Sequence, residues 1–485
     1  MSTFAEYENY DALGLAELVR RKEVTPAELL EAAFARVDAE NPKINAVVLE
    51  QRDLAMRRAK TEKLSGPFAG VPMLLKDLGC EAIDFPTNNG SRLFANTVHT
   101  YDSEIYLRLA RAGFVTFGRT TSPEFGIGPT TESQVYGGPT RNPLSLAHTS
   151  GGSSGGAGAA VAAGILPAAH GSDGGGSLRI PASNCGLFAL KATRARFPDG
   201  PASGEGWAGM AIDGFLTRSV RDTAAILDAT HGPDLGAPYW APPAEGSYSE
   251  ALKSPGRRLR IAIMTRTFSV DGRSGAPVHP DCAAGVAHAA RLLADLGHEL
   301  VEAEPQIDIL ALMRGWADIV ACGTALTVRG QERLLGRMAR PDELEGVTWG
   351  AIEHARGVSG ADYIAAVARV HDAGRVMARF FAGGREGGLG SGTAIDALLT
   401  PTLAEPPTVL GRFKPDVRDF VEYRVGEAGV LGYSPFTALF NATGQPAVNL
   451  PMWRNAAGLP VGVQVAGRFG EERGLMQVAR DVEGV

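Results

Sequence analysis

Three consecutive glycines stand directly before a serine, Ser177, in the segment HGSDGGGSLRIP at residues 170–181. A serine that transfers acyl groups needs a base to take its proton and N–H groups to bind the oxyanion. Because glycine has no Cβ atom, successive amides can turn inward and a substrate carbonyl can approach them closely. The segment therefore predicts a nucleophile beside an oxyanion hole, although a glycine-rich turn that caps a helix would have the same pattern. The predicted oxyanion donors are the amides of Gly174, Gly175, Gly176 and Ser177.

The base for this reaction has two candidates. Histidine is the usual base and His170 is close in sequence, but no G-x-S-x-G motif surrounds Ser177 or Ser153, so the α/β-hydrolase pattern is absent. Lys76 follows directly after the apolar run VPMLL. A lysine drawn into an apolar site is a competent base, because desolvation favours its neutral amine. The same position would also suit an ordinary lysine at the end of a strand, with its side chain in solvent.

A serine- and glycine-rich segment, TSGGSSGGAGAA at residues 149–160, lies between Lys76 and Ser177 in the sequence. It matches neither G-x-x-x-x-G-K-[ST] nor a strand followed by G-x-G-x-x-G and a distal acid, so it does not predict a phosphate-binding loop. Hydroxyls flanked by glycines suit a proton relay better than a phosphate site.

These segments, in this order along the chain, resemble the amidase signature family. GGSSGGAGAAVAAGILPAAHGSDGGGSLRIPASNCGLFALKAT, residues 151–193, is similar to the family's serine- and glycine-rich signature, and GVPMLLKDLG is similar to its lysine segment. The resemblance continues through GRTTSPEFG, TRNPLSLAHTSGG, FNATGQPAVNLP and GLPVGVQVAG, and so spans most of the chain. Within the family, residues 15–48 and 177–191 look most like the aminohexanoate cyclic-dimer hydrolases, which open nylon-type cyclic amides.

The resemblance implies a Ser–cis-Ser–Lys catalytic triad. In it Ser177 is the nucleophile, Ser153 is the bridging serine that follows a cis peptide bond, and Lys76 is the base. The resemblance also implies that Ser154 is a supporting hydrogen bonder. Asp173 and Arg179 match family positions that brace the oxyanion loop.

One position departs from the family pattern. Gly174 stands where a larger apolar residue is common, and we expect it to widen or loosen the loop while keeping the amides. Two further segments are similar to the walls of the family's substrate pocket. They are the loop at residues 124–134, with Gly126 as a candidate substrate-binding residue, and the helical segment around Cys322.

The elements around these residues alternate between helix and strand. Thr25 and Glu28 form a capping box that predicts the start of a helix, and Pro42 predicts its end. The apolar run at residues 71–75 predicts a strand that ends at Lys76, whereas the chain beyond about residue 200 looks like loops.

Farther along the chain, RRLRIAIMT and HELVEAEP flank a helical pattern at residues 279–296 and predict a β–α–β unit. No internal repeat or long linker divides the chain. We therefore predict one large α/β domain, residues 1–485, with the signature at about residues 70–195 and a mostly helical insertion at residues 307–383. The resemblance implies that its central β-sheet is mixed and covered by helices on both faces.

The composition excludes several classes of partner. The chain carries 47 Lys and Arg against 54 Asp and Glu, a net charge of −7, and has no basic run of the kind expected for nucleic acid or an anionic membrane. Residues 1–15 are acidic and polar, unlike a secretory signal peptide. The four cysteines form no CxxC pair and suit a reducing cytoplasm. We predict a cytoplasmic protein without a metal, an organic cofactor, nucleic acid or a membrane partner; its oligomeric state stays open, with a homodimer as one option.

The combined pattern predicts an amidase that hydrolyses a C–N bond of a linear or cyclic small-molecule amide through a serine acyl-enzyme. Carbamates (urethanes) and esters share the carbonyl geometry and stay open as substrates. The amidase subunit of a glutamine-dependent tRNA amidotransferase shares the signature, but the lysine segment here has KDLG where that group usually has KDN. A non-catalytic binding protein is disfavoured because Lys76, Ser153 and Ser177 are all present.

Overall fold

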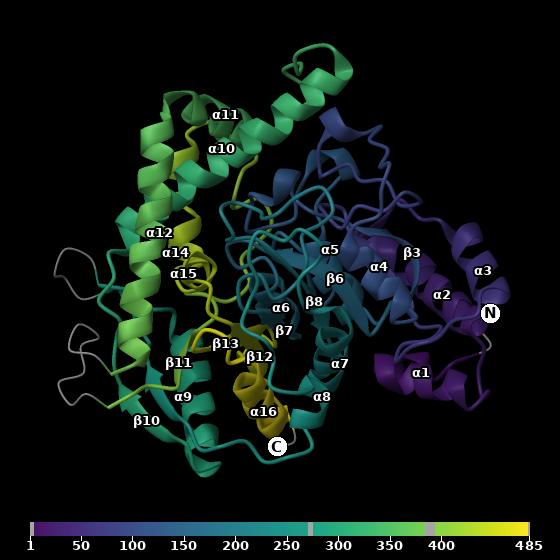
Figure 1. Cartoon of the computed structure of the whole chain (residues 1–485), viewed down its shortest axis with the longest axis horizontal. Helices are drawn as coiled ribbons and strands as arrows, with labels where there is room; N and C mark the ends of the chain where they lie inside the picture. The colour runs from purple at the N-terminus through teal and green to yellow at the C-terminus, as the bar shows by residue number, and fades with distance from the viewer. Residues whose placement is uncertain (1–3, 270–274, 384–392, 484–485) are drawn as a thin grey trace.

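A mixed eight-stranded β-sheet forms the centre of the protein (Figure 1). The structure is a computed structural model and describes residues 4–269, 275–383 and 393–483. The strand order is β10-β9-β11-β13-β12-β7-β8-β6, with β9 parallel to β10 and β11 and the other pairs antiparallel. The strands are β6 (Ala168–Asp173), β7 (Phe188–Lys191), β8 (Ile212–Thr217), β9 (Arg260–Ile263), β10 (Glu299–Glu302), β11 (Ala397–Pro401), β12 (Ala447–Arg454) and β13 (Pro460–Gly467).

Helices pack against both faces of this sheet. Side chains at successive strand positions point to opposite faces. On β13, Gly462 lies against Ser183 of α6, whereas Val463 lies against α9 and Gly467 against α16. The predicted α/β fold with a covered mixed sheet is therefore confirmed. The longer helices of the first half are α1 (Ala12–Arg20), α2 (Pro26–Ile44), α3 (Arg52–Thr61), α4 (Glu104–Arg111), α5 (Gly155–Ala162), α6 (Arg179–Cys185) and α7 (Val220–Thr230). Those that follow are α8 (Tyr248–Ala251), α9 (Pro280–Asp295), α10 (Ile309–Leu335), α11 (Gly346–Gly357), α12 (Gly360–Phe381), α13 (Phe420–Val425), α14 (Val430–Tyr433), α15 (Thr437–Thr443) and α16 (Glu472–Glu483).

A smaller sheet, in the order β1-β3-β2, positions the candidate lysine. Its strands are β1 (Val47–Val48), β2 (Pro72–Lys76) and β3 (Val115–Thr120), and a separate hairpin pairs β4 (Arg141–Asn142) with β5 (Ser145–Thr149). β2 is buried along its whole length and lies beside β6, the edge strand of the large sheet. The backbone N–H of Lys76 donates to Nδ1 of His170 on β6 at 3.2 Å, so a side chain joins the two sheets.

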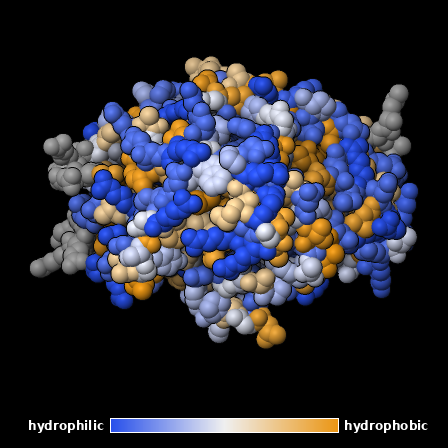
Figure 2. All heavy atoms as spheres, turned by 90° about the horizontal axis from the view of Figure 1, so that it is seen from above, coloured by the Kyte–Doolittle hydropathy of each residue, from blue (hydrophilic) through white to orange (hydrophobic). Residues whose placement is uncertain are grey.

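Three long helices, α10, α11 and α12, form a layer beside the sheet and make a second apolar core with α13 and α15 (Figure 1). They fall within the segment predicted to be helical. Among the described residues, α10 is the one helix long and apolar enough to cross a membrane, but 61% of that apolar window is buried inside the protein. Burial of this kind is typical of a core helix. Hydrophilic residues cover most of the face seen in Figure 2, and apolar residues form separate patches.

The structure corrects two predictions about elements. The capping box of α2 is present, but the helix continues through Pro42 to Ile44 and ends at Asn45, whose φ is +50°. The Asn41 side chain holds this last turn, because its Oδ1 accepts from the N–H groups of Ala46 and Val47. The chain beyond residue 200 also contains more than loops, since it forms β8 and α7.

Candidate active site

Lys76 is wholly buried at the end of β2, and its side chain points inward rather than to solvent. Its Nζ atom lies 2.7 Å from Oγ of Ser153 and 2.9 Å from Oγ of Ser172. Burial lowers the pKa of Lys76 to about 7, although the Asp173 and Asp213 carboxylates oppose that shift. A large fraction of this lysine is therefore neutral near pH 7 and able to accept a proton.

Ser153 and Ser177 line one cavity, although they come from different segments. A cis peptide bond, Gly152–Ser153, precedes the first of them. Both serines are buried, and 9% of Ser177 is exposed. Lys76 is not among the residues that line the cavity, so it reaches the cavity through Ser153. Ser154 supports this arrangement, because its N–H donates to the carbonyl oxygen of Ser177 at 3.1 Å.

The Asp173 carboxylate and the Arg179 guanidinium brace the loop between them from inside the protein. Asp173 accepts hydrogen bonds from the N–H groups of Gly176 and Leu178, and a two-pronged ion pair joins it to Arg179 at 2.9–3.0 Å. Burial alone would raise the pKa of Asp173, but Arg179 and Asn441 hold it below its ordinary value. The ion pair is fully buried and completely hydrogen-bonded, and such pairs fix one geometry.

Two side chains hold the carbonyl groups of the glycine loop. Nε1 of Trp316 donates to the carbonyl oxygen of Gly174 at 3.2 Å, and Oγ1 of Thr437 donates to that of Gly175 at 2.7 Å. The structure gives the amides of Gly174, Gly175 and Ser177 no acceptor within the described ranges. The Gly176 amide differs from its neighbours, because it donates to Asp173 at 2.8 Å. Three of the four predicted oxyanion donors are thus unengaged, and the fourth holds the loop.

At Gly174, where the sequence departs from the family pattern, an aromatic side chain packs against the loop. A Cβ atom on Gly174 would lie 2.6 Å from the ring of Trp207, so the indole fills the space of a larger residue. Trp207 in turn meets Trp316 edge to face at 5.7 Å between ring centroids. The expectation of a looser loop is therefore wrong, since the loop is packed on this side.

His170 is not placed to act as the base. Its Nδ1 accepts from the Lys76 backbone, and its Nε2 lies 3.0 Å from Oδ1 of Asp213. This pattern assigns the proton to Nε2, which donates to the carboxylate. Both ring nitrogens are engaged, so no lone pair faces Ser177.

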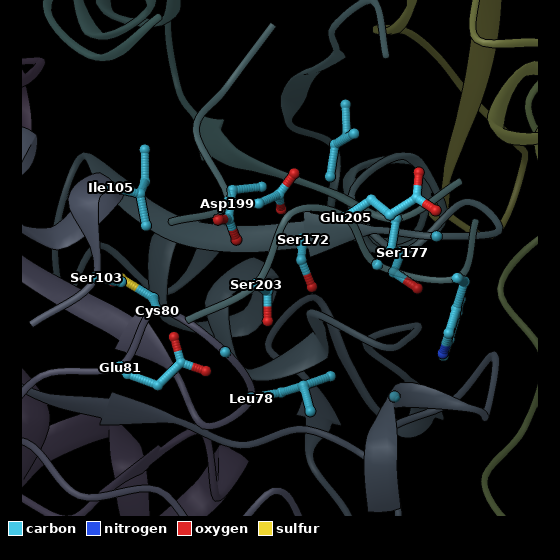
Figure 3. A pocket seen from close by; sticks show the side chains of 18 of the residues that line it. Leu78, Cys80, Glu81, Ser103, Ile105, Ser172, Ser177, Asp199, Ser203 and Glu205 are labelled. Atoms are coloured by element: carbon cyan, nitrogen blue, oxygen red, sulfur yellow. The ribbon is translucent and has the colours of Figure 1, made fainter. Parts of the chain in front are cut away.

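The cavity measures about 330 Å³, within the range of roughly 300–1,000 Å³ common for small-molecule sites (Figure 3). Gly126 lines it and lies against Ser153: a Cβ atom there would be 3.1 Å from the Ser153 hydroxyl. Cys322 does not line it. On α10, Thr324 and Thr327 line the cavity. Cys322 is two positions before Thr324 and therefore lies on another side of the helix.

Sequence reasoning missed Ser172, Trp316 and Thr437. Ser172 lies two residues after His170, and residues two apart on a strand share a face. Both side chains face Lys76, so the position of His170 could have indicated Ser172. Nothing local marks the other two. In the part of the chain that the structure describes, no group of three or more His, Cys, Asp or Glu side chains is placed to hold a metal ion. The four cysteines, Cys80, Cys185, Cys282 and Cys322, are unpaired.

The fold and the site define an α/β protein with a mixed central sheet and a buried lysine beside paired serines, and the chain belongs to the amidase family. Residues 28–476 match the family model described as Amidase. The predicted family is therefore confirmed, and the protein is an amide C–N hydrolase that acts on a small-molecule amide.

Individual relatives and solved structures are similar to this chain over nearly its whole length. The chain is 37% identical to a 6-aminohexanoate-cyclic-dimer hydrolase of Paenarthrobacter ureafaciens, over 98% of this chain and 94% of the relative. A solved structure of a 6-aminohexanoate cyclic dimer hydrolase complexed with substrate matches with a TM-score of 0.89 and 35% identity, over 98% of this chain and 97% of the other. A bacterial aryl acylamidase of the amidase signature family matches with a TM-score of 0.85 and 26% identity, over 98% and 96%.

Proposed function

We propose that the protein hydrolyses its amide through an acyl-enzyme on Ser177, with Ser153 and Lys76 as the proton relay. The observation that carries the proposal is the 2.7 Å contact between Nζ of Lys76 and Oγ of Ser153, in a setting where burial lowers the lysine pKa to about 7. A lysine with this pKa can take a proton near neutral pH and return it within the same reaction.

In the first half-reaction the Ser177 oxygen bonds to the amide carbonyl carbon. The hydroxyl proton moves to Ser153, whose own proton moves to Lys76. The carbonyl oxygen becomes an oxyanion, which the amides of Gly174, Gly175 and Ser177 bind. When the C–N bond breaks, Lys76 returns a proton through Ser153 to the leaving nitrogen, and the free amine departs.

In the second half-reaction water attacks the acyl carbon and loses its proton through the same relay. The bond between Ser177 and the acyl carbon then breaks, and the proton returns to the serine oxygen. The carboxylic acid leaves, and each residue of the relay regains its first protonation state. Ser153, Gly174 and Ser177 line the cavity and Lys76 reaches it through Ser153, so the proposed reaction requires no further co-reactant except water.

The relatives support a proposal for the substrate class. We propose a linear or cyclic aliphatic amide, because the relative at 37% identity is named for hydrolysis of a cyclic amide dimer. Carbamates and esters would react by the same steps, and urethane hydrolysis is the second candidate. A role as the amidase subunit of a tRNA amidotransferase gains no support from the site. A cytoplasmic location and a homodimer stay predictions, as does the division into a signature core and a helical insertion.

The experiment combines a labelled nucleophile with a substrate panel. A fluorophosphonate probe followed by peptide mass spectrometry should place the adduct on Ser177, and Ser177→Ala should remove both label and turnover. Aryl amides, linear and cyclic aliphatic amides, and aryl carbamates should then be compared by kcat/KM. An adduct on another residue, or full turnover by Ser177→Ala, would contradict the proposal.

A further inference from the structure

The residues that line the cavity include acids but no bases. Four carboxylic side chains belong to this lining, while no lysine, arginine or histidine of the described residues does. The four acids are Glu81, Asp199, Glu205 and Asp213. A cavity lined by charges of one sign attracts ligands of the opposite sign, and its low-dielectric walls strengthen that attraction.

Among the described residues no lysine or arginine forms an ion pair with these acids, although Lys76 interacts electrostatically with Asp213 and Arg194 with Glu205. His170 donates to Asp213, and the Tyr239 hydroxyl donates to Glu205. Within the described chain, the Glu81 carboxyl is hydrogen-bonded to its own backbone N–H but forms no ion pair, and the Asp199 carboxyl has neither a hydrogen bond nor an ion pair. The Arg119 guanidinium lowers the pKa of Glu81 from a distance, but its donors are bound to backbone carbonyls of Lys76, Cys80 and other residues of that turn.

The protonation of these acids agrees with their geometry. Burial raises the pKa of Asp199 to about 8, and the neighbouring carboxylates, Asp213 first, add to the shift. Burial also raises the pKa of Glu81. The Asp199 carboxyl therefore keeps its proton near pH 7, and a bound cation would favour its charged form.

A hydroxyl of the same lining points to a hydrogen-bonding ligand independently of charge. Thr324 is 2% exposed, and within the described chain its hydroxyl oxygen has no hydrogen-bond partner. Buried polar atoms are nearly always satisfied, so an unsatisfied hydroxyl in a cavity indicates a partner that the protein itself does not supply. A primary ammonium carries three donors and can bond to carboxylates and hydroxyls together.

We infer that the cavity takes amides that carry a second, protonated amine, whose ammonium group is bound by Glu81 and Asp199 while the scissile carbonyl reaches Ser177. Figure 3 shows Glu81 and Ser103 on one side of the cavity, Ser177 on the other, and Asp199 between them in this view. The inference rests on the proposed function and names its substrate class: ω-amino amides, or diamines acylated at one end.

Matched substrates test the charge without changing the shape. 6-Aminohexanamide is compared with heptanamide, and N-(4-aminobutyl)acetamide with N-pentylacetamide, since each pair exchanges an ammonium for a methyl group. A pH of about 8.5 keeps the primary amine protonated, because its pKa is about 10.4. We expect kcat/KM for the cationic member of at least one pair to be about tenfold higher. Equal values in both pairs, or a preference for the neutral members, would overturn the inference.

Substitutions of the two acids then test whether they cause the preference for the cationic substrate. Glu81→Gln and Asp199→Asn should each lower the cationic-to-neutral ratio of kcat/KM toward one, with thermal unfolding measured to confirm folding. The matched control is Glu31→Gln, which makes the same charge change at an exposed position on α2 and should leave the ratio unchanged. A ratio that survives both cavity substitutions in folded protein would show that other groups select the substrate.

A binding measurement separates this inference from the proposed hydrolysis. Ser177→Ala protein is titrated by calorimetry with hexylammonium and with hexan-1-ol. We expect the cation to bind about tenfold more tightly, and Glu81→Gln in the same background to remove the difference. If the cation is preferred but no amide is hydrolysed, the proposed function fails and the inference stands. If amides are hydrolysed and the cation is not preferred in either assay, the inference fails and the proposed function stands.

Discussion

The indole N–H of Trp316, on α10, donates to the carbonyl oxygen of Gly174 at 3.2 Å and so fixes one peptide group of the glycine loop. In a trans peptide the C=O and N–H groups point in opposite directions. A carbonyl held on one side therefore directs the Gly175 N–H to the other side. This contact makes a helix outside the signature segment part of the machinery that orients the proposed oxyanion donors.

Removing this single donor should lower kcat more than it changes KM. Trp316→Phe keeps an aromatic ring at the site and loses the N–H, so we expect about a tenfold loss of kcat from imprecise orientation of the oxyanion donors. Trp349→Phe is the matched control, because its Nε1 also donates to a backbone carbonyl, that of Pro341 at 3.3 Å, away from the loop. Steady-state kinetics measures both. Equal effects of the two substitutions, or a Trp316→Phe change confined to KM, would refute the positioning role.

The packing of Gly174 against Trp207 predicts a compensating pair of substitutions. Gly174→Val should lower kcat/KM strongly, since its side chain would meet the indole 2.6 Å from the Cβ position. Adding Trp207→Gly makes room and should recover part of the loss, which a double-mutant cycle quantifies. Gly330→Val on α10 is the control, because no neighbouring atom lies within 4 Å of its Cβ position. No recovery in the double variant would show that valine fails at this position for a reason other than Trp207.

The proposed relay makes its nucleophile without a metal, so chelation should not affect the rate. Dialysis against EDTA should leave kcat and KM unchanged. Activity that falls on dialysis and returns with zinc or manganese would mean that the roles given to Lys76 and Ser153 are misassigned.

The sequence predicts the members of the site better than the contacts that hold them. Lys76, Ser153 and Ser177 stand in recognisable segments, and the structure brings them to one place. Trp316 lies 142 residues from Gly174 and Thr437 lies 262 residues from Gly175, so no local pattern links them. Only packing of the helical layer onto the sheet creates these contacts.

Secondary structure is likewise predicted well where the local pattern is strong and missed where tertiary contacts decide it. The β–α–β unit of β9, α9 and β10 has strong local periodicity, and it forms as predicted. β8 was missed because IDGFLT contains Asp and Gly, which disfavour strands in isolation. Its place between β6 and β7 supplies the pairing that its own residues do not predict.

The pH dependence of kcat/KM should report the buried base. Lys76 accepts a proton only when neutral, and its pKa is lowered to about 7, so the rate should rise through pH 7 and stay level in the alkaline range. Below that pKa the neutral fraction falls about tenfold per pH unit. The same midpoint should persist in Glu81→Gln and Asp199→Asn, whose acids also have raised pKa values. A kcat/KM profile that is flat through pH 7, or a midpoint that shifts in Glu81→Gln or Asp199→Asn, would show that a group other than Lys76 titrates.

The strictest test of the base uses substitutions at Lys76 itself. Lys76→Arg should lose nearly as much kcat as Lys76→Ala, because a guanidinium stays protonated and cannot accept the serine proton. The relay should act as a unit, so Lys76→Ala combined with Ser177→Ala should be little worse than Ser177→Ala alone. Lys63→Met, at an exposed position, is the control and should leave the rate and its pH profile unchanged.

Stability distinguishes a lost base from a damaged fold. The pKa of Lys76 is about 7 in the folded protein and 10.5 as its ordinary value. Between these values the unfolded chain binds more protons, so stability rises with pH and the buried lysine costs free energy at neutral pH. Lys76→Met fills a similar volume without a charge and should raise the free energy of unfolding at pH 7 while abolishing turnover. Chemical denaturation and kinetics on the same preparation measure both. An active Lys76→Met enzyme would show that the proton goes to another group, and an inactive but destabilised one would show that Lys76 is paired more favourably in the fold than its burial indicates.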